Sequence, residues 1–269
     1  MLASMRGLQA IAHMALDAVL PPTCAKCRTV VARNGTVCAD CWKELRFLGQ
    51  PWCDCCGFPF EYDPATLDVL GDSLGESASD VLSGADSRGP LCADCLRSPK
   101  PFDRARAALG YDDASRALIL AFKHADRTET AATLAAWMTQ AGAELLEDAD
   151  VVVPVPLHWR RLFLRRYNQS ALLARKLAEG CGKPFLAQGL ERRRATRSQG
   201  HLSANARRLN VAGAFRVRPS QRREIEGRRV LLIDDVYTTG ATITACAKSL
   251  SDGGAAGVDV LVLARVFRV

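Results

Sequence analysis

A chain of 269 residues, 48% of them hydrophobic, can form one substantial core and a smaller module. It has no apolar run of the roughly 18 residues that a membrane span needs, so we expect no transmembrane helix. The formal net charge is +7, and positive charge is concentrated between Arg160 and Arg229, with nineteen Lys or Arg against four Glu. Such a stretch favours anionic partners, and a solvated arginine-rich surface is the plainer alternative.

The first element, residues 1–22, is predicted to be a short amphipathic helix. Its apolar residues recur at helical spacing, and Pro21 and Pro22 end the pattern. His13 and Asp17 interrupt the uncharged core that a signal peptide requires. Without an export signal, the chain is expected in the reducing cytoplasm.

Residues 23–100 form a candidate zinc module, because most of the eleven cysteines occur there in Cys-x-x-Cys pairs. The pairs are Cys24 with Cys27, Cys38 with Cys41, Cys53 with Cys56, and Cys92 with Cys95. The first two pairs have the compact spacing of a tetrahedral zinc site, and the last two form a second potential quartet. We therefore expect one or two structural zinc ions, with disulfides as the alternative. Metal should hold this region together, since its apolar residues are scattered.

The choice of Cys56 over the adjacent Cys55 follows from the residues after it. Gly57 and Pro59 resemble a zinc knuckle, in which a flexible glycine lets backbone amides bond the thiolate, so Cys55 is expected to be a spare. Cys181 and Cys246 are unpaired and are expected to be buried thiols. Residues 61–91, rich in Asp, Glu, Gly and Ser, are predicted to be an acidic loop insert.

From residue 101 to residue 269, strand and helix patterns alternate. Strands are predicted at 106–111, at 150–156 with a Pro-rich end, at 229–233 and at 258–266. Helices are predicted around 118–122, around 134–138, at 168–180 with Gly180 or Gly182 as the stop, and at 241–250. This alternation predicts an α/β domain with a mostly parallel sheet flanked by helices.

The most informative segment follows the strand at 230–233. Asp234 and Asp235 are expected at its carboxyl end, where open α/β sheets bind ligands, and two ionised carboxylates can accept hydrogen bonds from vicinal hydroxyls. A loop of small and hydroxylated residues follows, whose backbone N–H groups can surround an oxyanion at a helix N-terminus. Its residues are Thr238, Thr239, Gly240, Ala241 and Thr242. The alternative is a tight turn with an Asp cap and no ligand.

The order of strand, acidic pair, hydroxylated loop and helix resembles the phosphoribosyl pyrophosphate (PRPP) binding signature of type I phosphoribosyltransferases. The resemblance implies that Asp234 and Asp235 form the catalytic pair and meet the ribose hydroxyls, with the 5′-phosphate in the loop at 238–242. It also implies magnesium and pyrophosphate near an earlier strand end, for which residues 153–158 have the right place. A strand simply terminated by proline is the alternative for that segment.

The arginine-rich segments narrow the resemblance to one family of phosphoribosyltransferase-like proteins. The chain has an Arg-rich run from Trp159 to Gln169 and another at 192–197, and it resembles the ComF family, also called GntX-like or DNA-utilisation proteins. Members join a cysteine-rich zinc module to a type I phosphoribosyltransferase-like fold, and the resemblance covers essentially the whole chain. The family usually has Gly where Arg166 stands, which puts the tightness of that turn in question.

Two functions follow as expectations. The first is transfer of a phosphoribosyl group from PRPP to an unidentified acceptor, with Arg161, Arg165 and Arg197 as candidate anion contacts and residues 191–210 as a mobile hood. The second, implied by the family's link to natural competence, is a non-catalytic adaptor for single-stranded DNA that PRPP regulates. Competence or helicase proteins are further candidate partners. Trp159, Phe163 and Tyr167 could stack bases, although aromatics at helical spacing more often pack in a core.

Overall fold

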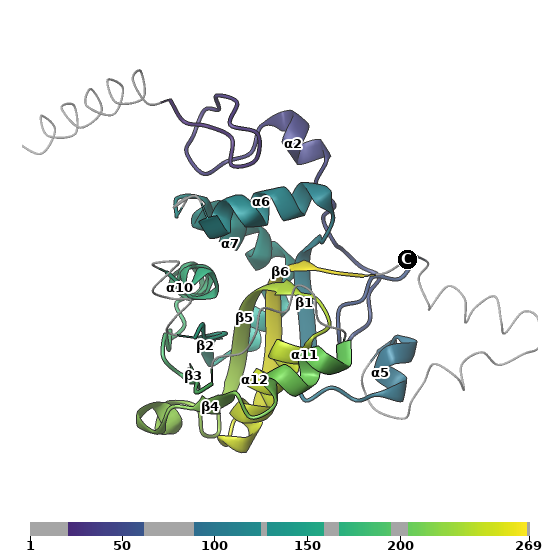
Figure 1. Cartoon of the computed structure of the whole chain (residues 1–269), viewed down its shortest axis with the longest axis vertical. Helices are drawn as coiled ribbons and strands as arrows, with labels where there is room; N and C mark the ends of the chain where they lie inside the picture. The colour runs from purple at the N-terminus through teal and green to yellow at the C-terminus, as the bar shows by residue number, and fades with distance from the viewer. Residues whose placement is uncertain (1–20, 62–88, 125–127, 159–166, 195–203, 268–269) are drawn as a thin grey trace, which may run out of the picture.

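The computed structural model describes residues 21–61, 89–124, 128–158, 167–194 and 204–267. Its centre is a four-stranded parallel sheet in the order β1-β6-β5-β2 (Figure 1). The strands are β1 (Arg104–Gly110), β2 (Val151–Pro154), β5 (Arg229–Tyr237) and β6 (Gly257–Arg265). This confirms the predicted α/β class with a parallel sheet.

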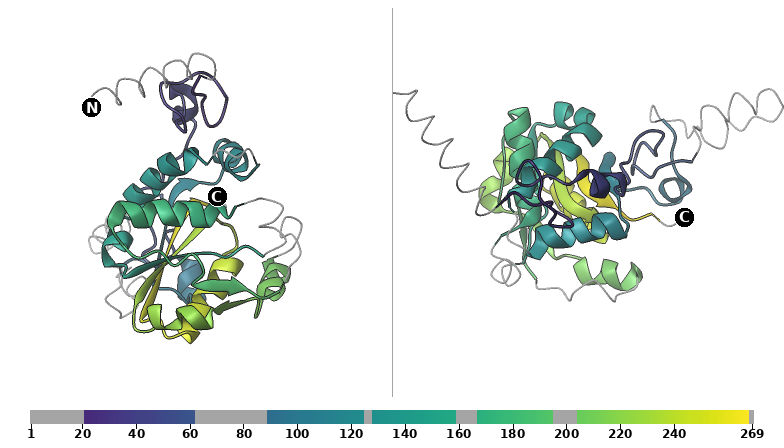
Figure 2. Two further views of the ribbon diagram at one scale, coloured as in Figure 1. Left: turned by 90° about the vertical axis from the view of Figure 1, so that its left-hand side faces the viewer. Right: turned by 90° about the horizontal axis from the view of Figure 1, so that it is seen from above.

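Both faces of the sheet are covered, because its strands alternate buried side chains between two apolar clusters. Leu231 and Ile233 of β5 pack on the face that carries α6, α7, α8 and α10, whereas Val230 and Leu232 pack on the face of α12 (Figure 2). The helices are α6 (Asp113–His124), α7 (Thr130–Ala141), α8 (Ala143–Asp148), α10 (Gln169–Cys181) and α12 (Ala241–Asp252). We call these the α7 face and the α12 face.

A small antiparallel hairpin stands apart from the main sheet. It pairs β3 (Leu190–Arg192) with β4 (Phe215–Val217), and α11 (Ala204–Val211) and the 3₁₀ helix η1 (Pro219–Glu224) lie next to it in the chain. The sequence did not predict these strands, because three residues are too few to show a period of two.

Residues 46–58 of the cysteine-rich region lie along β1, an outer strand of the sheet. The amide of Leu48 donates to the carbonyl of Ala108 at 3.0 Å, and the amide of Ala105 donates to the carbonyl of Cys55 at 2.7 Å. This region also contributes two short helices, α2 (Ala39–Lys43) and α5 (Ala93–Arg97). The predicted zinc module is therefore joined to the sheet by backbone hydrogen bonds.

The bounds of several elements differ from the predictions, most of all at the end of β5. The strand predicted at 229–233 continues through both aspartates to Tyr237, because β6 offers partners as far as the pair of Tyr237 with Arg265. Of the two stops predicted for helix α10, Gly180 and Gly182, the structure uses Gly182, whose φ of 67° makes a left-handed cap. Cys246 is buried as expected, but Cys181 is only partly buried.

Some predictions fall outside the described residues. The helix at 1–22 and the insert at 61–91 lie almost entirely there, and the domain boundaries stay predictions. No helix in the described ranges is long and apolar enough to cross a membrane.

Candidate functional site

The candidate site lies where β2 and β5 end side by side. The two strands are parallel neighbours, with Pro154 in register with Ile233, and the amide of Val155 donates to the carbonyl of Ile233 at 2.9 Å. The chain leaving β2 therefore runs directly past Asp234. The shared carboxyl edge of parallel strands brings together two segments that are distant in the sequence.

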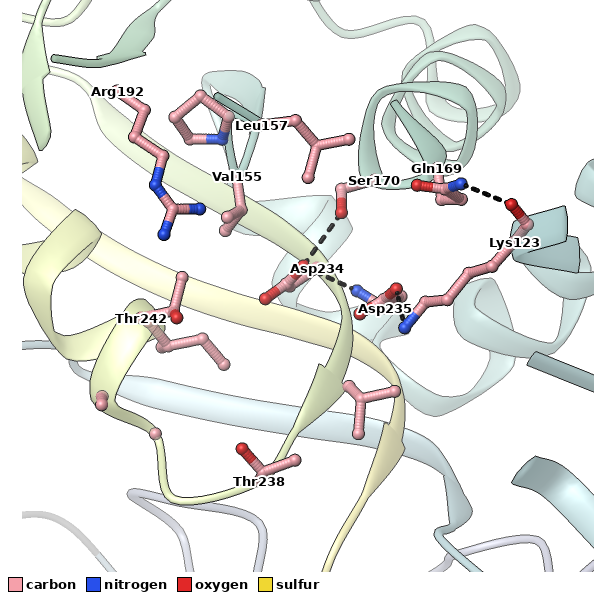
Figure 3. Close-up of a pocket in the computed structure, with 15 residues that line it drawn as sticks. Lys123, Val155, Leu157, Gln169, Ser170, Arg192, Asp234, Asp235, Thr238 and Thr242 are labelled. Atoms are coloured by element: carbon pink, nitrogen blue, oxygen red, sulfur yellow. Dashed lines mark hydrogen bonds and ion pairs between the residues drawn. The ribbon is translucent and has the colours of Figure 1, made fainter. Parts of the chain in front are cut away.

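A cavity of about 220 Å³ opens at this edge (Figure 3). Five segments that are separate in the sequence line it: the end of α6, the loop after β2, the start of α10, strand β3 and the loop between β5 and α12. The lining residues are Lys123, Val155, Pro156, Leu157, Gln169, Ser170, Arg192, Asp234, Asp235, Val236, Thr238, Gly240, Ala241, Thr242 and Ile243.

The two aspartates have different surroundings. Asp234 Oδ1 accepts hydrogen bonds from Ser170 Oγ at 2.9 Å and from the amide of Asp235 at 2.9 Å. Burial, followed by the negative charge of Asp235, nevertheless raises the pKa of Asp234 to about 7. Asp235 Oδ2 lies 2.6 Å from Lys123 Nζ. The pair therefore combines a carboxylate held by an ammonium group with a carboxyl group that titrates near neutral pH.

The loop after β5 turns sharply over an aromatic ring. Gly240 has a φ of +75°, and a Cβ placed there would lie 2.5 Å from Cε2 of Tyr237, so both the backbone angle and the space favour glycine. Helix α12 begins at the next residue and directs its N-terminal end at the cavity. Four of the five predicted loop residues line the cavity, whereas Thr239 is exposed and does not.

The start of α10 contributes residues that the sequence analysis did not assign to the site. Asn168 caps the helix by accepting from the amide of Ser170 at 3.1 Å, and its Nδ2 donates to the carbonyl of Val155 at 3.0 Å. Gln169 Nε2 donates to the carbonyl of Lys123 at 3.3 Å. The N-cap residue Asn168 before a helical pattern is a sequence signal that could have pointed to Ser170. Nothing in the local pattern pointed to Lys123.

The three predicted arginines cannot be placed, and a different arginine lines the cavity in the described residues. Arg161, Arg165 and Arg197 all lie outside the described residues, as do Trp159, Phe163 and Arg166. Arg192 of β3 lines the cavity, and its guanidinium lies over the ring of Phe215 at 5.2 Å (Figure 3). Tyr167, one of the candidate stacking residues, donates its hydroxyl to the carbonyl of Phe122 at 2.7 Å and so holds the chain to α6.

A larger cavity of about 680 Å³ adjoins the first and shares Pro156, Leu157 and Arg192 with it. The β3-β4 hairpin provides its basic wall through Arg193, Arg216 and Arg218 as well as Arg192. Among these arginines stands one glutamate, Glu191, which pairs with Arg216 and lies 3.7 Å from Arg218. The wall therefore keeps an excess of positive charge.

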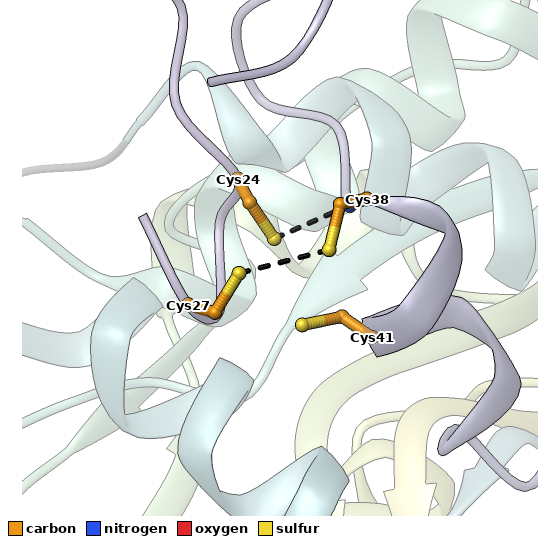
Figure 4. Close-up of side chains that lie close together, drawn as sticks. All are labelled: Cys24, Cys27, Cys38 and Cys41. Carbon is orange, nitrogen blue, oxygen red and sulfur yellow. Dashed lines mark hydrogen bonds between the residues drawn. The ribbon is translucent and has the colours of Figure 1, made fainter. Parts of the chain in front are cut away.

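Two groups of four cysteines are assembled in the described residues. In each, the four sulphur atoms lie within 4.8 Å of one another. The first cluster consists of Cys24, Cys27, Cys38 and Cys41 (Figure 4). The second cluster consists of Cys53, Cys56, Cys92 and Cys95. None of the eleven cysteines, which all lie in the described ranges, forms a disulfide.

The donor sets fit structural zinc. Backbone amides point at the first sulphur of each cluster: Lys26 and Cys38 at Cys24, and Cys56 and Cys92 at Cys53, at 3.2 to 3.5 Å. Such N–H donors stabilise zinc-bound thiolates, and four thiolates close a tetrahedral site. The sequence left one or two ions open, and the structure forms two quartets. Cys55 lies outside both, as predicted.

Comparison with known proteins agrees with this architecture. Residues 15–72 match the double zinc ribbon domain family. The chain is 36% identical over 179 residues to DNA utilization protein YhgH of Salmonella typhimurium, covering 65% of this chain and 77% of the relative. It is 29% identical over 249 residues to competence protein F of Haemophilus influenzae, covering 90% and 96% respectively.

Among solved structures, the orotate phosphoribosyltransferase of Aeropyrum pernix matches with 19% identity and a TM-score of 0.30, over 59% of this chain and 80% of that chain. A TM-score this low carries no argument about the ligand, which is therefore inferred from the residues that line the cavity.

The protein is thus a parallel α/β protein whose sheet carries two four-cysteine clusters of the double zinc ribbon type. The chain belongs to the ComF/YhgH family, whose members are named DNA utilization and competence proteins.

Proposed function

We propose that the protein binds PRPP with magnesium and transfers the phosphoribosyl group to an acceptor. The observation that carries this proposal is the single cavity shared by Asp234, Asp235, the N-terminal end of α12 and the loop after β2. Carboxylates suit the two ribose hydroxyls, and a helix N-terminus with a glycine turn suits the 5′-phosphate. Few other small ligands require both features a few ångströms apart.

The loop after β2 is the proposed place for the pyrophosphate group. Val155, Pro156 and Leu157 bound the cavity beside Asp234, and Arg192 faces it from the side opposite Lys123 (Figure 3). Guanidinium groups stay charged and can hold phosphate oxygens in pairs. Magnesium, held through the substrate, would neutralise further charge on the pyrophosphate.

In the proposed reaction, a nucleophilic atom of the acceptor bonds to the anomeric carbon of ribose. The bond from that carbon to the pyrophosphate oxygen breaks, pyrophosphate leaves with the electron pair, and the acceptor loses its proton to solvent. Asp234 and Asp235 hold the ribose hydroxyls and place negative charge beside the ring, where positive charge develops. Lys123 places a positive charge beside Asp235, 2.6 Å from its Oδ2.

Isothermal titration with PRPP and magnesium tests the binding step. Wild type should bind, and the double variant Asp234→Asn with Asp235→Asn should lose binding by about a hundredfold or more, since two hydrogen bonds to charged acceptors are lost. Asp252→Asn, at the exposed far end of α12, is the matched control and should bind like wild type. Equal affinity in the double variant and wild type would contradict the proposal.

Transfer is tested separately by release of pyrophosphate in the presence of nucleobases, amines or DNA. Release that depends on an acceptor and disappears in the double aspartate variant supports transfer. Tight PRPP binding with no release for any acceptor would reduce the proposal to ligand binding.

A second candidate function is binding of single-stranded DNA, and the larger basic cavity favours it. Four arginines line that cavity, and the relatives are named for DNA utilization and competence. Backbone phosphates would meet the guanidinium groups of the β3-β4 hairpin. The affinity should then fall steeply with salt concentration.

This second function is tested with a single-stranded oligonucleotide at several salt concentrations. Arg193→Gln should weaken binding and reduce the salt slope by about one, as expected for one phosphate contact. Arg223→Gln on η1, also exposed, is the matched control. DNA binding that survives the double aspartate variant would separate the two functions, and a flat salt dependence would count against a phosphate contact.

A further inference from the structure

The second cysteine cluster is built into the hydrophobic core on the α12 face. Cys53, Cys56 and Cys95 are each at most 5% exposed and belong to the same buried cluster as Tyr237 and Ala241, which flank the proposed phosphate loop. Gly57, directly after Cys56, has a φ of +67°, and a Cβ there would lie 2.3 Å from the carbonyl oxygen of Ala105. The cluster therefore has little room to move relative to the sheet.

One side chain connects this cluster to the site. Arg265, the last residue of β6, donates through Nη1 to the carbonyl of Cys56, and its Nη2 lies 3.4 Å from Cys56 Sγ. The same guanidinium lies over the ring of Tyr237, 4.3 Å from the centroid. Arg265 and Tyr237 are also partners in the β5-β6 register.

The ring of Tyr237 in turn supports the phosphate loop. It is 6% exposed, and Gly240 turns so closely over it that even a Cβ would overlap the ring. A shift of the ring would displace the turn at Gly240 and with it the first amides of α12. A continuous series of contacts thus runs from Cys56 through Arg265 and Tyr237 to the loop that lines the cavity.

We propose that Arg265 is a positioning residue that couples metal occupancy of the second cysteine cluster to the shape of the phosphate loop, residues 238–242. A metal bound in the second cluster fixes Cys56 in place, and with it the carbonyl that accepts the hydrogen bond from Arg265 Nη1. That bond fixes the guanidinium over Tyr237, and the ring holds Gly240 in its left-handed turn. This proposal depends on the proposed function in one respect only, namely that the loop binds PRPP.

The first cluster provides a comparison within the same chain. It packs on α7 through Trp42, whose ring centroid lies 5.5 Å from that of Trp137. Its contacts therefore lead to the α7 face and not to the loop after β5. Emptying the first cluster should leave the loop unchanged, whereas emptying the second should loosen it.

Hydrogen–deuterium exchange of the peptides that contain residues 238–242 measures the coupling without any ligand. Arg265→Gln and Cys92→Ser should each speed exchange of these amides by about tenfold. Cys27→Ser, which removes a ligand from the first cluster, should leave exchange unchanged. Arg175→Gln is the matched control for loss of an arginine over an aromatic ring, since Arg175 lies over Phe185 at 5.7 Å on α10.

If Cys92→Ser fails to fold, Arg265→Gln still decides the question, because it keeps all eight cysteines. In this variant, zinc in the second cluster should pass to a chromogenic chelator faster than in wild type, and zinc in the first cluster should be unaffected. Tyr237→Leu should loosen the loop to a similar degree. Adding Arg265→Gln to Tyr237→Leu should add little, because both interrupt one series of contacts.

Titration with PRPP and magnesium then separates the two proposals. Binding is expected to weaken by about tenfold in Arg265→Gln, and PRPP should strengthen zinc retention in the second cluster by the same factor, since coupling is reciprocal. If wild type does not bind PRPP, the proposed function fails while the exchange data still decide the coupling. Loop exchange and zinc retention that match wild type in Arg265→Gln would overturn the coupling, even with normal PRPP binding.

Discussion

The two cysteine clusters have the same ligands but different relations to the sheet. The first cluster lies on the α7 face, where Cys24 and Cys41 are buried, Cys27 is exposed and the ring of Trp42 contacts Trp137. The second belongs to the hydrophobic core of the α12 face, which contains Cys53, Cys56 and Cys95. A zinc ribbon can therefore be an appended unit or a part of the core, and the Cys-x-x-Cys spacing does not distinguish the two cases.

The two faces also supply different walls of the cavity. Lys123 and Ser170, from helices of the α7 face, hold the two aspartates. The α12 face supplies the turn at Gly240 that begins α12. On the proposed function, the ligand would contact both faces, one through the carboxylates and one through the phosphate loop, and the contacts through Arg265 lead from the α12 face to the second cysteine cluster.

The largest expected difference between the clusters is in folding. Cys53→Ser should lower the midpoint of the thermal transition much more than Cys27→Ser, because structural zinc contributes about 10–16 kcal/mol to such sites and this cluster is part of the core. Cys27→Ser should lose zinc from the first cluster but keep the transition of the sheet. Zinc content and differential scanning calorimetry measure both. Equal destabilisation by the two substitutions would remove the distinction between an appended and a core cluster.

Substitutions of Trp137 and Trp42 test the contact between the first cluster and helix α7. Trp137→Ala should lower the free energy of unfolding by about 3–5 kcal/mol, since it leaves a cavity under the cluster and in α7. Trp42→Ala should cost only about 1 kcal/mol, because that ring is 47% exposed. Urea unfolding followed by far-ultraviolet circular dichroism gives both values. PRPP affinity at saturating zinc should be unchanged in both variants, and a loss there would connect the α7 face cluster to the site.

The raised pKa of Asp234 gives a pH-dependent prediction. Because the pKa of Asp234 is raised from 3.8 to about 7 in the folded protein, its contribution to stability is fully present only below about pH 3.8 and is lost progressively as pH rises from there to about 7. Asp234→Asn should therefore raise the melting temperature by a few degrees at pH 8 and by clearly less at pH 5. PRPP binding has the opposite sign, since an ionised acceptor is needed: affinity should fall about tenfold per pH unit below the pKa. Titrations from pH 5.5 to 8.5 test this, and a flat profile in wild type would contradict it.

The smallest expected effect concerns Lys123. Its ammonium group lowers the pKa of Asp234 and neutralises Asp235, so Lys123→Met should move the midpoint of the pH profile upward by about one unit or less. Lys176→Met, on the exposed side of α10, is the matched control and should leave the midpoint unchanged. An unchanged midpoint in Lys123→Met would show that the ammonium group of Lys123 does not affect the pKa of Asp234.

Part of the site could be predicted because its signal is local. Asp234, Asp235 and the loop to Thr242 form one continuous segment, and backbone chemistry alone indicates an anion site there. The cysteine pairs carried a similar signal, because thiolates at that spacing have few other uses in a reducing compartment. The exact end of β5 could not be predicted, since it depends on how far β6 extends beside it.

The residues that complete the site were not predictable in this way. Lys123, Ser170 and Arg192 reach the cavity from three separate segments, and no local pattern marks them as ligand contacts. Choosing among the many arginines was equally uncertain, because their type is uniform and only the fold decides which one faces the cavity. The arginines chosen from the sequence stay predictions, since they lie outside the described residues.

The sequence by itself determined the parallel α/β class, the acidic pair with its loop, and the two sets of cysteines. Each of these depends on the spacing of residues that are close together in the sequence. Only the tertiary structure decided that the two cysteine clusters belong to opposite faces and that Arg265 joins one of them to the loop. Those relations depend on which strands lie side by side, and strand order is set by packing between segments that are distant in the sequence, above all β1 with β6.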